Sequence, residues 1–214
     1  MLVLHRAGLC LEAQLVARTI FELRLSFDAF IELLRADLKG ACYRVLDAWK
    51  LEKAKQARAS EFKGFDLAPG APTPDELRAS DREIAERYDD ADLGRLKKYG
   101  FTGMSVEQRA KRSGLTDEYN IVYRNFSRNV HSTDFTELFL QEDPSGISLD
   151  YEDYLERRNV VCCDLVLVSV ASMADAVNSH AGLGLDRRFN DLHRAVEGLN
   201  SQRRQDSEQR PKSR

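Results

Sequence analysis

The sequence has little that would hold a metal ion, a disulfide framework or a membrane anchor. Its four cysteines are Cys10, Cys42, Cys162 and Cys163, with no C-x-x-C pair and no cysteine–histidine spacing typical of zinc. We therefore predict reduced, buried cysteines that act as small hydrophobic residues. No stretch reaches the roughly 18 uncharged apolar residues of a membrane span, and polar and acidic residues come too early for a signal peptide. These absences predict a cytoplasmic protein without a metal site or a membrane segment.

The sequence also lacks an excess of charge and most familiar catalytic motifs. Lys and Arg number 32 against 35 Asp and Glu, a formal net charge of -3, so no overall positive field exists to hold a long nucleic-acid duplex. Any nucleic-acid contact must be local. There is no P-loop, no nucleophile elbow, no complete G-x-G-x-x-G and no Glu-x-x-His of the di-iron kind. We expect no cofactor.

Strand-like alternation and internal repeats are absent as well, which predicts an all-α fold. We expect a helical bundle of about five to seven helices with irregular loops. With 43% hydrophobic residues in 214, the chain can bury a sizeable core, and we predict a single domain over residues 1–200. Residues 64–74 form a Pro/Gly-rich loop or insertion in this prediction, and the polar residues 201–214 form a disordered tail.

Apolar spacing and capping residues place the predicted helices. The first begins near Leu9 with one apolar stripe, Val16, Ile20, Leu23, Phe27, Phe30 and Leu34. Others are expected over 41–62, which carries Val45, Leu46, Trp49 and Leu51, over 74–98, over 105–113 before Gly114, and over 186–199. Asp117 is placed to cap a helix that ends near Ser132. Residues 154–180 read as a central buried helix that ends at Gly182-Leu-Gly184.

One segment, YRNFSRNVHSTDF over 123–135, combines a helical apolar pattern with unusual polar chemistry. At about 100° per residue, Arg124, Arg128 and His131 occupy one narrow arc, bordered by Asn120 and Ser127. The apolar residues Tyr119, Val122, Phe126 and Val130 lie on roughly the opposite side. One interpretation is a solvated helix face. The other is a phosphodiester site, because arginine binds phosphate with a forked donor and histidine exchanges protons near neutral pH.

The spacing Arg124-Asn125-(five residues)-His131 resembles the R-x(4 to 6)-H motif of HEPN (higher eukaryotes and prokaryotes nucleotide-binding) domains. The resemblance implies a small all-α bundle, and many such proteins are metal-independent endoribonucleases of toxin-antitoxin, CRISPR and abortive-infection systems. Arg187 and Arg188 also precede His193 at allowed spacings. We prefer the first copy because Asn125 follows its arginine and because the segment has a clear helical pattern.

Carried over to this sequence, the resemblance implies a role for each matched residue. His131 would be the general acid-base, Arg124 would stabilise negative charge on the phosphate, and Asn125 would orient these groups. Arg128, with Ser127 and Tyr123 beside it, would contact the RNA backbone. The substrate would be single-stranded RNA, the site would form in a homodimer, and an antitoxin or a defence-complex subunit would be a further partner.

Two sequence elements also resemble an uncharacterised family of helical bacterial proteins, with R-(S/T)-(I/L)-F-E upstream and Y-x(7)-H downstream. Arg18 to Glu22 reads R-T-I-F-E, and Tyr123 precedes His131 at the required distance. This likeness implies no activity. Arg18 and Glu22 are one helical turn apart, so they either form an intrahelical ion pair or reach the same pocket as supporting residues.

A different functional class stays open from sequence alone. In that alternative the polar face of residues 124–131 binds a nucleotide, an RNA or a protein without catalysis, or the chain is one subunit of a larger defence assembly. RNA cleavage that persists in EDTA would favour the enzyme, whereas binding without turnover would favour the module.

Overall fold

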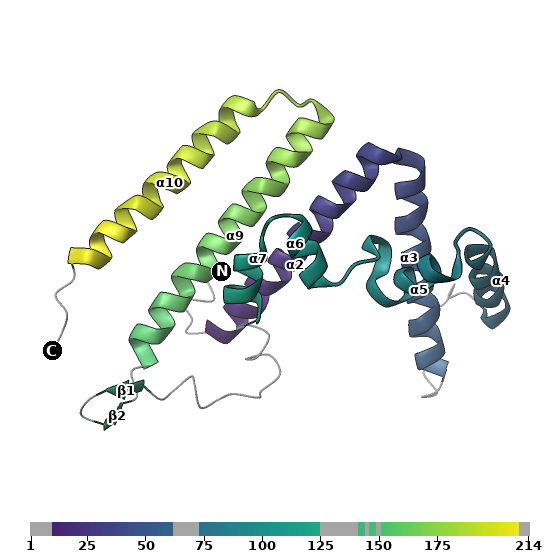
Figure 1. Cartoon of the computed structure of the whole chain (residues 1–214), viewed down its shortest axis with the longest axis horizontal. Coiled ribbons are helices and arrows are strands. Elements are labelled where there is room, and N and C mark those ends of the chain that lie inside the picture. Colours follow the sequence, from purple (N-terminus) through teal and green to yellow (C-terminus); the bar gives the residue numbers. More distant parts are fainter. Residues whose placement is uncertain (1–9, 62–72, 125–140, 144–145, 149–150, 210–214) are drawn as a thin grey trace. The chain divides into compact units, whose positions relative to one another are not determined.

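The computed structural model describes residues 10–61, 73–124, 141–143, 146–148 and 151–209, and these residues are overwhelmingly helical (Figure 1). The α-helices are α2 (Cys10–Ala36), α3 (Leu38–Glu61), α4 (Pro74–Ala85), α5 (Asp90–Tyr99), α6 (Val106–Arg112), α7 (Thr116–Glu118), α9 (Tyr151–Ala181) and α10 (Asp186–Gln209). A 3-10 helix, η1 (Gly100–Thr102), and a π-helix, η2 (Tyr119–Tyr123), complete them. The predicted all-α class is confirmed, with eight α-helices in the described residues, one above the predicted range.

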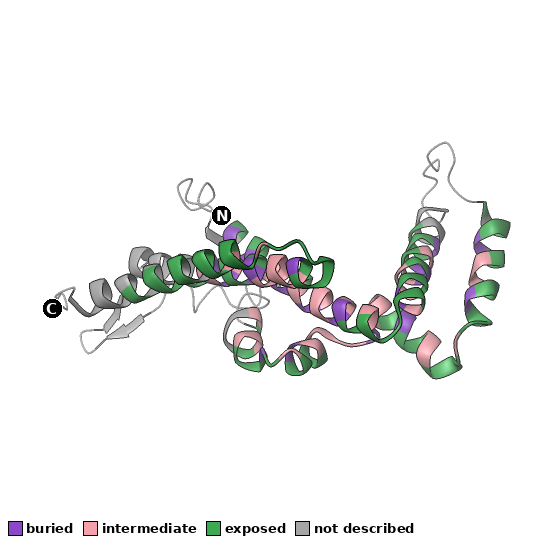
Figure 2. Ribbon diagram, turned by 90° about the horizontal axis from the view of Figure 1, so that it is seen from above, coloured by how far each residue is buried: buried purple, intermediate pink, exposed green. Residues whose placement is uncertain are grey.

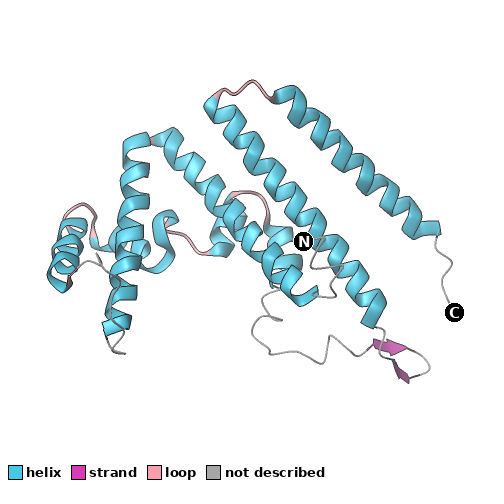
Figure 3. Ribbon diagram, turned by 180° about the vertical axis from the view of Figure 1, so that it is seen from behind, coloured by secondary structure: helices cyan, strands magenta, loops and turns pink. Residues whose placement is uncertain are grey.

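A small antiparallel hairpin is the one feature of a different class in the described residues (Figure 3). Strand β1 (Gln141–Asp143) pairs with β2 (Gly146–Ser148), and Glu142 faces Ile147 in the register. These strands were not expected from the sequence. Three residues are too few for an alternating pattern to be recognised, because strand signals need about four to eight residues.

Contacts divide the chain into two compact units. Unit 1 comprises residues 1–27 and 115–214, and unit 2 comprises residues 28–114. Helix α2 contributes its first part to unit 1 and its end to unit 2. The predicted single domain over 1–200 stays a prediction, since two contact units can belong to one domain.

The buried face of α2 differs from the predicted stripe. From Ala13 to Ala29 every fourth residue is buried, and the largest of them are Phe21 and Leu25. Leu23, which we placed in the stripe, is 56% exposed. The prediction was wrong because it counted only large apolar side chains. Alanines at three of these positions allow other parts of the chain to approach the helix backbone closely.

Helix α9 is less buried than the predicted central helix. Cys162, Leu165 and Ser169 are buried, whereas Leu167 and Val170 are exposed. Its Val161–Ala181 stretch is the one described helix that is long and apolar enough to cross a membrane by length and composition. The stretch contains the charged residues Asp164 and Asp175, so it does not contradict the statement that no run of uncharged apolar residues is long enough to span a membrane.

Helices α9 and α10 lie side by side and antiparallel, joined by a short turn (Figure 1). Gly182 and Gly184 have positive φ angles and end α9, as predicted. The buried Asn178 holds the turn, since its Nδ2 donates to Asp186 Oδ1 at 2.7 Å and its Oδ1 accepts from the backbone N–H of Leu185 at 2.9 Å.

Helix α10 continues ten residues past its predicted end at Leu199 and reaches Gln209. The segment predicted as a disordered tail therefore begins inside this helix. Its residues are mainly Gln, Arg, Glu and Ser, and the first three are good helix formers, so the segment can extend a helix without burying apolar surface. Figure 2 accordingly shows the helix that leads to the C-terminus as mostly exposed where its burial is described.

Unit 2 is organised around α3. Leu51 of α3 packs with Ile84 of α4 and Leu96 of α5 in one buried cluster. A second cluster joins Ala54 and Leu77. Trp49 is 59% exposed and Leu46 is also exposed, so these two side chains do not contribute to the core as their apolar character suggested.

The helix predicted over 74–98 is in fact two helices. Thr73 and Glu76 form a capping box at the start of α4, as the Thr-Pro-Asp-Glu sequence indicated. The chain leaves the helix after Ala85, and Asp89 caps α5 by accepting from the backbone N–H of Asp92. An aspartate inside a polar helical pattern was therefore an unrecognised start signal.

The next elements follow the prediction. Gly100 and Gly103 both have positive φ angles around η1, which lies between the helices predicted over 74–98 and 105–113. Ser105 caps α6 in a capping box with Gln108, and Gly114 follows the helix with a φ angle of 69°.

The cysteines agree with the prediction only in part. Cys42, Cys162 and Cys163 form no disulfide within the described residues. Cys162 is buried and Cys163 is partly buried, but Cys42 is exposed on α3, so its predicted burial was wrong.

Candidate functional site

The segment that leads into Arg124 begins with an irregular helix in unit 1. Leu115 occupies the N-cap position of α7 and makes no side-chain capping bond. Asp117 lies in the first turn instead of at the cap, so the predicted capping role was wrong. An acid in that turn still favours the helix through the dipole.

The five residues after α7 form the π-helix η2, in which the backbone N–H of Arg124 donates to the carbonyl of Tyr119. This wider turn replaces the 100° rotation on which the predicted arc was based. Tyr119 and Tyr123 stack, with ring centroids 5.1 Å apart and planes 18° from parallel. The Arg124 guanidinium lies 5.6 Å from the centre of the Tyr119 ring. π-turns inside helices occur frequently at functional sites.

Tyr123 also joins η2 to helix α2 within unit 1. Arg18 Nη2 donates to the Tyr123 hydroxyl at 3.2 Å, across 105 residues of sequence. The same guanidinium lies 4.9 Å from the centre of the Tyr123 ring, and the Phe21 ring centroid is 6.3 Å away. Arg18 Nε donates to Glu22 Oε1 at 3.1 Å. We call Arg18, Phe21, Glu22, Tyr119 and Tyr123 the Tyr123 cluster.

The environment of Tyr123 keeps its hydroxyl protonated. Burial is the main cause that raises the pKa of Tyr123, the Arg18 hydrogen bond opposes it, and Glu22 raises it further through its charge and a hydrogen bond. The neutral hydroxyl therefore accepts from Arg18 and can donate to Glu22. A protonated hydroxyl of this kind can position neighbouring groups, but it is poorly suited to accept a proton.

The predicted intrahelical ion pair of Arg18 and Glu22 is confirmed, whereas their role as supporting residues of a shared pocket stays a prediction. They form the intrahelical ion pair, and they also meet Tyr123 from the distant segment. The R-T-I-F-E and Y-x(7)-H elements that carry the second resemblance therefore contact each other through Arg18, Phe21 and Tyr123. Whether these residues support a reaction stays a prediction.

Arg124 is exposed, and no ion pair of its side chain is found among the residues that the structure describes. The other residues of the predicted site, Asn125, Ser127, Arg128 and His131, lie outside the described residues. The second motif copy differs in this respect, because Arg187 and Arg188 are described and exposed on α10.

Two members of the Tyr123 cluster were not predicted as site residues. Tyr119 was assigned to an apolar stripe, whereas its ring stacks with that of Tyr123 and also contacts the Arg124 guanidinium. Phe21 lies between Arg18 and Glu22 in the R-T-I-F-E element, which was the available signal. Within the described ranges, no group of three or more His, Cys, Asp or Glu side chains could hold a metal ion.

Comparison with known proteins gives one family match, over residues 1–147, to a group described as "Family of unknown function (DUF5677)". No curated protein and no solved structure matches the chain. The matched region contains both halves of the Tyr123 cluster and the complete R-x(6)-H segment. Because the match covers more than half of the 214 residues, the chain belongs to the DUF5677 family.

Proposed function

We propose that this protein is a HEPN-like, metal-independent endoribonuclease. The observation that carries the proposal is the contact between Arg18 and Tyr123, which fixes the residue directly before Arg124 against α2. Arg124 is left exposed at the start of the R-x(6)-H segment, where a phosphate could reach it. In this proposal the Tyr123 cluster holds in place the backbone next to Arg124, the arginine that binds phosphate.

The proposed reaction uses the neighbouring ribose as the nucleophile. His131 removes the proton of the 2′-hydroxyl and the 2′-oxygen bonds to phosphorus. The bond to the 5′-oxygen then breaks as the protonated His131 returns this proton to the leaving 5′-oxygen. Products are a 2′,3′-cyclic phosphate and a 5′-hydroxyl. Arg124 stabilises the extra negative charge on the phosphate oxygens through charge-assisted hydrogen bonds.

The remaining predicted residues complete this proposal. Asn125 orients the reacting groups, and Arg128 with Ser127 contacts the RNA backbone. Tyr123 acts through its contacts with Arg18 and Glu22 as a positioning residue. A requirement for the 2′-hydroxyl restricts the substrate to RNA, and single strands offer the flexible geometry that the attack needs.

The proposal includes a biological setting and an assembly. The enzyme acts in the cytoplasm as part of a bacterial toxin-antitoxin or anti-phage defence system, and two chains form the working homodimer. An antitoxin or a defence-complex subunit controls it.

The test is cleavage of single-stranded RNA in EDTA by the purified full-length chain. We expect cutting that leaves cyclic phosphate ends, and loss of at least about 100-fold in rate for His131→Ala, since general acid–base catalysis typically contributes that much. Arg124→Ala should lose a comparable factor. Arg78→Ala is the matched control, because Arg78 is an exposed arginine paired with Asp75 on α4.

Wild-type cleavage that survives unchanged in His131→Ala would contradict the mechanism. A DNA copy of the RNA should not be cut, because it lacks the attacking hydroxyl. Circular dichroism of each variant should match the wild type, so that lost activity reports chemistry and not unfolding.

A non-catalytic RNA-binding module is the second candidate. Tyr119 and Tyr123 stack on each other, and Arg124 contacts the Tyr119 ring. Bases of single-stranded nucleic acids commonly stack on tyrosine and arginine side chains. Tight binding by the wild type without turnover under any tested condition, weakened in Arg124→Ala, would favour this module over the enzyme.

A further inference from the structure

Unit 2 contains a pocket of about 240 Å³ that is separate from the residues of the proposed nuclease. It is lined by Ala29, Glu32, Leu33, Ala36, Arg44, Arg95, Thr102, Gly103, Met104 and Arg112. Three of these are arginines, and they come from three different helices, α3, α5 and α6. No sequence pattern could group them, because nothing in their spacing links positions 44, 95 and 112.

Arg44 is the most firmly held of the three. Its side chain is only 17% exposed, and its Nε donates to the carbonyl of Phe101 at 2.6 Å. Its guanidinium lies 5.8 Å from the Tyr88 ring. A Cβ atom on Gly103 would lie 2.7 Å from Arg44 Nη2, and Gly103 has a φ angle of 63°. The positive φ angle therefore favours glycine there, and a larger residue would displace the end of the Arg44 side chain.

The terminal nitrogens of Arg44 have no hydrogen bond among the described residues. Arg44 Nη2 forms an ion pair with Asp92 Oδ1, but the distance of 3.8 Å is too long for a hydrogen bond. A purely structural arginine that joins α3 to η1 needs only its Nε for that contact. Fixed Nη donors on a largely buried guanidinium are suited to a planar or tetrahedral oxyanion.

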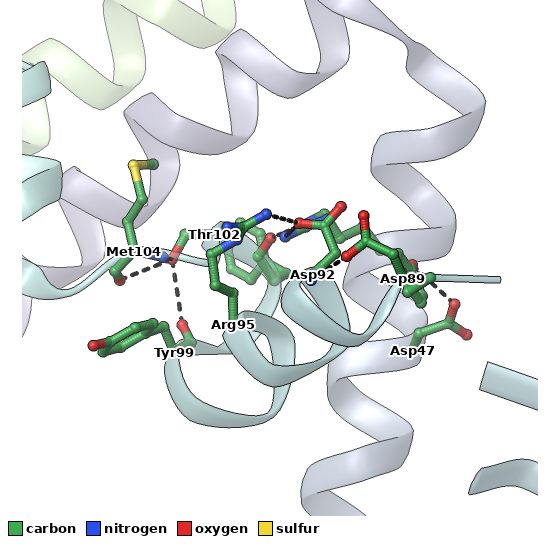
Figure 4. Close-up of polar contacts among 10 residues, drawn as sticks. Asp47, Asp89, Asp92, Arg95, Tyr99, Thr102 and Met104 are labelled. Atoms are coloured by element: carbon green, nitrogen blue, oxygen red, sulfur yellow. Dashed lines mark hydrogen bonds and ion pairs between the residues drawn. The ribbon is translucent and has the colours of Figure 1, made fainter. Parts of the chain in front are cut away.

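Arg95 and Arg112 add charge to the same pocket and remain about half exposed. Arg95 Nη2 contacts Asp92 Oδ1 at 2.7 Å, and Arg112 Nε contacts Glu32 Oε2 at 2.5 Å. Figure 4 shows the Arg95–Asp92 contact close to Thr102 and Met104. Three guanidinium groups against two carboxylates leave one net positive charge, which favours an anion in the pocket.

Apart from Glu32, which pairs with Arg112, the α2 side of the pocket is apolar. Ala29, Leu33 and Ala36 lie on α2, and Met104 follows η1. An inorganic anion would leave this wall in contact with water. A ligand with an apolar or aromatic part next to its anionic group would cover it.

We propose that this pocket binds a small phosphate monoester with an apolar or aromatic body. The phosphate lies between Arg44, Arg95 and Arg112, and the body contacts the α2 wall. A volume of about 240 Å³ lies below the roughly 300–1,000 Å³ of common ligand sites, so the ligand is small. The arginines surround one hollow and do not form the extended basic track that follows a nucleic-acid strand.

Isothermal titration calorimetry with phenyl phosphate and inorganic phosphate tests the proposal on the full chain. We expect saturable binding of both and tighter binding of phenyl phosphate. Arg95→Gln and Arg112→Gln are exposed changes that should preserve the fold, and each should weaken phenyl phosphate binding about tenfold, as expected for loss of a charge-assisted hydrogen bond. Arg44→Lys should weaken it at least as much.

Arg78→Gln is the matched control, because Arg78 pairs with Asp75 three residues away as Arg95 pairs with Asp92. It should leave binding unchanged. Affinity should rise as pH increases through about 6, where a phosphate monoester gains its second charge while the arginines stay protonated.

Absence of saturable binding to the wild type would overturn the proposal, as would equal affinity in Arg95→Gln, Arg112→Gln and the control. Binding of a single-stranded RNA oligonucleotide that depends on these arginines, without phenyl phosphate binding, would instead assign the pocket to RNA. Arg95→Gln and Arg112→Gln should cut single-stranded RNA at the wild-type rate, because neither residue belongs to the proposed nuclease site, so failure of the nuclease proposal and failure of the pocket proposal are distinguishable.

Discussion

Each unit contains an arginine, a carboxylate and a tyrosine in mutual contact, but the two arrangements differ in what lies at the centre. In unit 2 the centre is the Asp47 carboxylate, whose side chain is 1% exposed. Arg87 Nη1 donates to both of its oxygens, at 2.7 and 3.0 Å, and the Tyr88 hydroxyl donates at 3.1 Å. In unit 1 the centre is the Tyr123 hydroxyl, and the Arg18 and Glu22 side chains are 21% and 35% exposed.

This difference separates a structural contact from an adaptable one. A carboxylate removed from water must keep its partners, because an unpaired buried charge is strongly unfavourable. The Asp47 group therefore fixes α3 to the end of α4. In the Tyr123 cluster Arg18 and Glu22 are partly exposed, so water can replace a lost contact of either residue at small cost in free energy. These side chains can therefore change position when an anion approaches Arg124. The same three residue types thus give opposite properties, depending on which group is buried.

Removal of the Asp47 carboxylate should have the largest effect. We expect Asp47→Ala to lower the free energy of unfolding by about 3 kcal/mol, since loss of one partner of a buried pair typically costs about that much. Urea unfolding followed by circular dichroism measures it. Asp75→Ala, which breaks an exposed ion pair with Arg78, is the control and should change stability by less than about 0.5 kcal/mol. Equal effects of the two changes would contradict the comparison.

Alkaline pH should destabilise unit 2 through Tyr88. Burial, helped by the hydrogen bond to Asp47 and its charge, raises the pKa of Tyr88 to about 12, from 10.0. Between these values the unfolded chain has lost the phenolic proton and the folded chain keeps it, so stability falls as pH rises from 10.0 to about 12. A tyrosinate absorbance titration of wild type minus Tyr88→Phe should show one group titrating near the upper value. Titration near 10.0 would contradict the Asp47 contact.

Loss of the Tyr123 hydroxyl should have a smaller effect. Tyr123→Phe keeps the ring contacts with Phe21 and Tyr119 and removes the bond from Arg18, so we expect a loss of about 1 kcal/mol. Urea unfolding of Tyr123→Phe beside Tyr88→Phe measures the difference. Tyr88→Phe should be the more destabilising change, because its lost partner is a buried carboxylate, and the reverse order would undermine the contrast between the units.

Neutralising Glu22 should have the smallest effect. Glu22→Gln retains a hydrogen-bond acceptor for Arg18, and partly exposed ion pairs contribute less than about 1 kcal/mol. We expect a change within about 0.5 kcal/mol that shrinks further when salt is added. Asp47→Asn is the paired measurement in unit 2, and its larger, less salt-sensitive loss would complete the comparison.

Local signals in the sequence were sufficient for much of the fold. The caps at Thr73 and Ser105 follow from side chains that bond to the neighbouring backbone. The glycine after α6 follows from its freedom to adopt a positive φ angle, and the start of α2 follows from apolar residues at helical spacing. The buried face of α2 did not follow, because it depends on which small residues other helices approach. The division between α4 and α5 was not predicted, because an aspartate such as Asp89 also occurs on the solvent-exposed face of a continuous helix.

The candidate site was only half accessible to sequence reasoning. Arg18, Glu22 and Tyr123 were recognised as polar residues of interest, but nothing in their spacing says that Arg18 meets Tyr123. That contact depends on how α2 and η2 pack in unit 1, and the π-turn that presents Tyr119 to Arg124 has no clear sequence signature. The arginine pocket of unit 2 was beyond reach for the same reason.

Because residues 119–123 form a π-turn, the number of residues in this stretch affects where Arg124 points. This π-turn holds one residue more than an α-helical turn, so the direction in which Arg124 points depends on the number of residues before it as well as on their side chains. Shortening this stretch by a single residue would let an ordinary helix form while turning Arg124 away from its tyrosine neighbours. A deletion could therefore silence the proposed site even though every named functional group was still present.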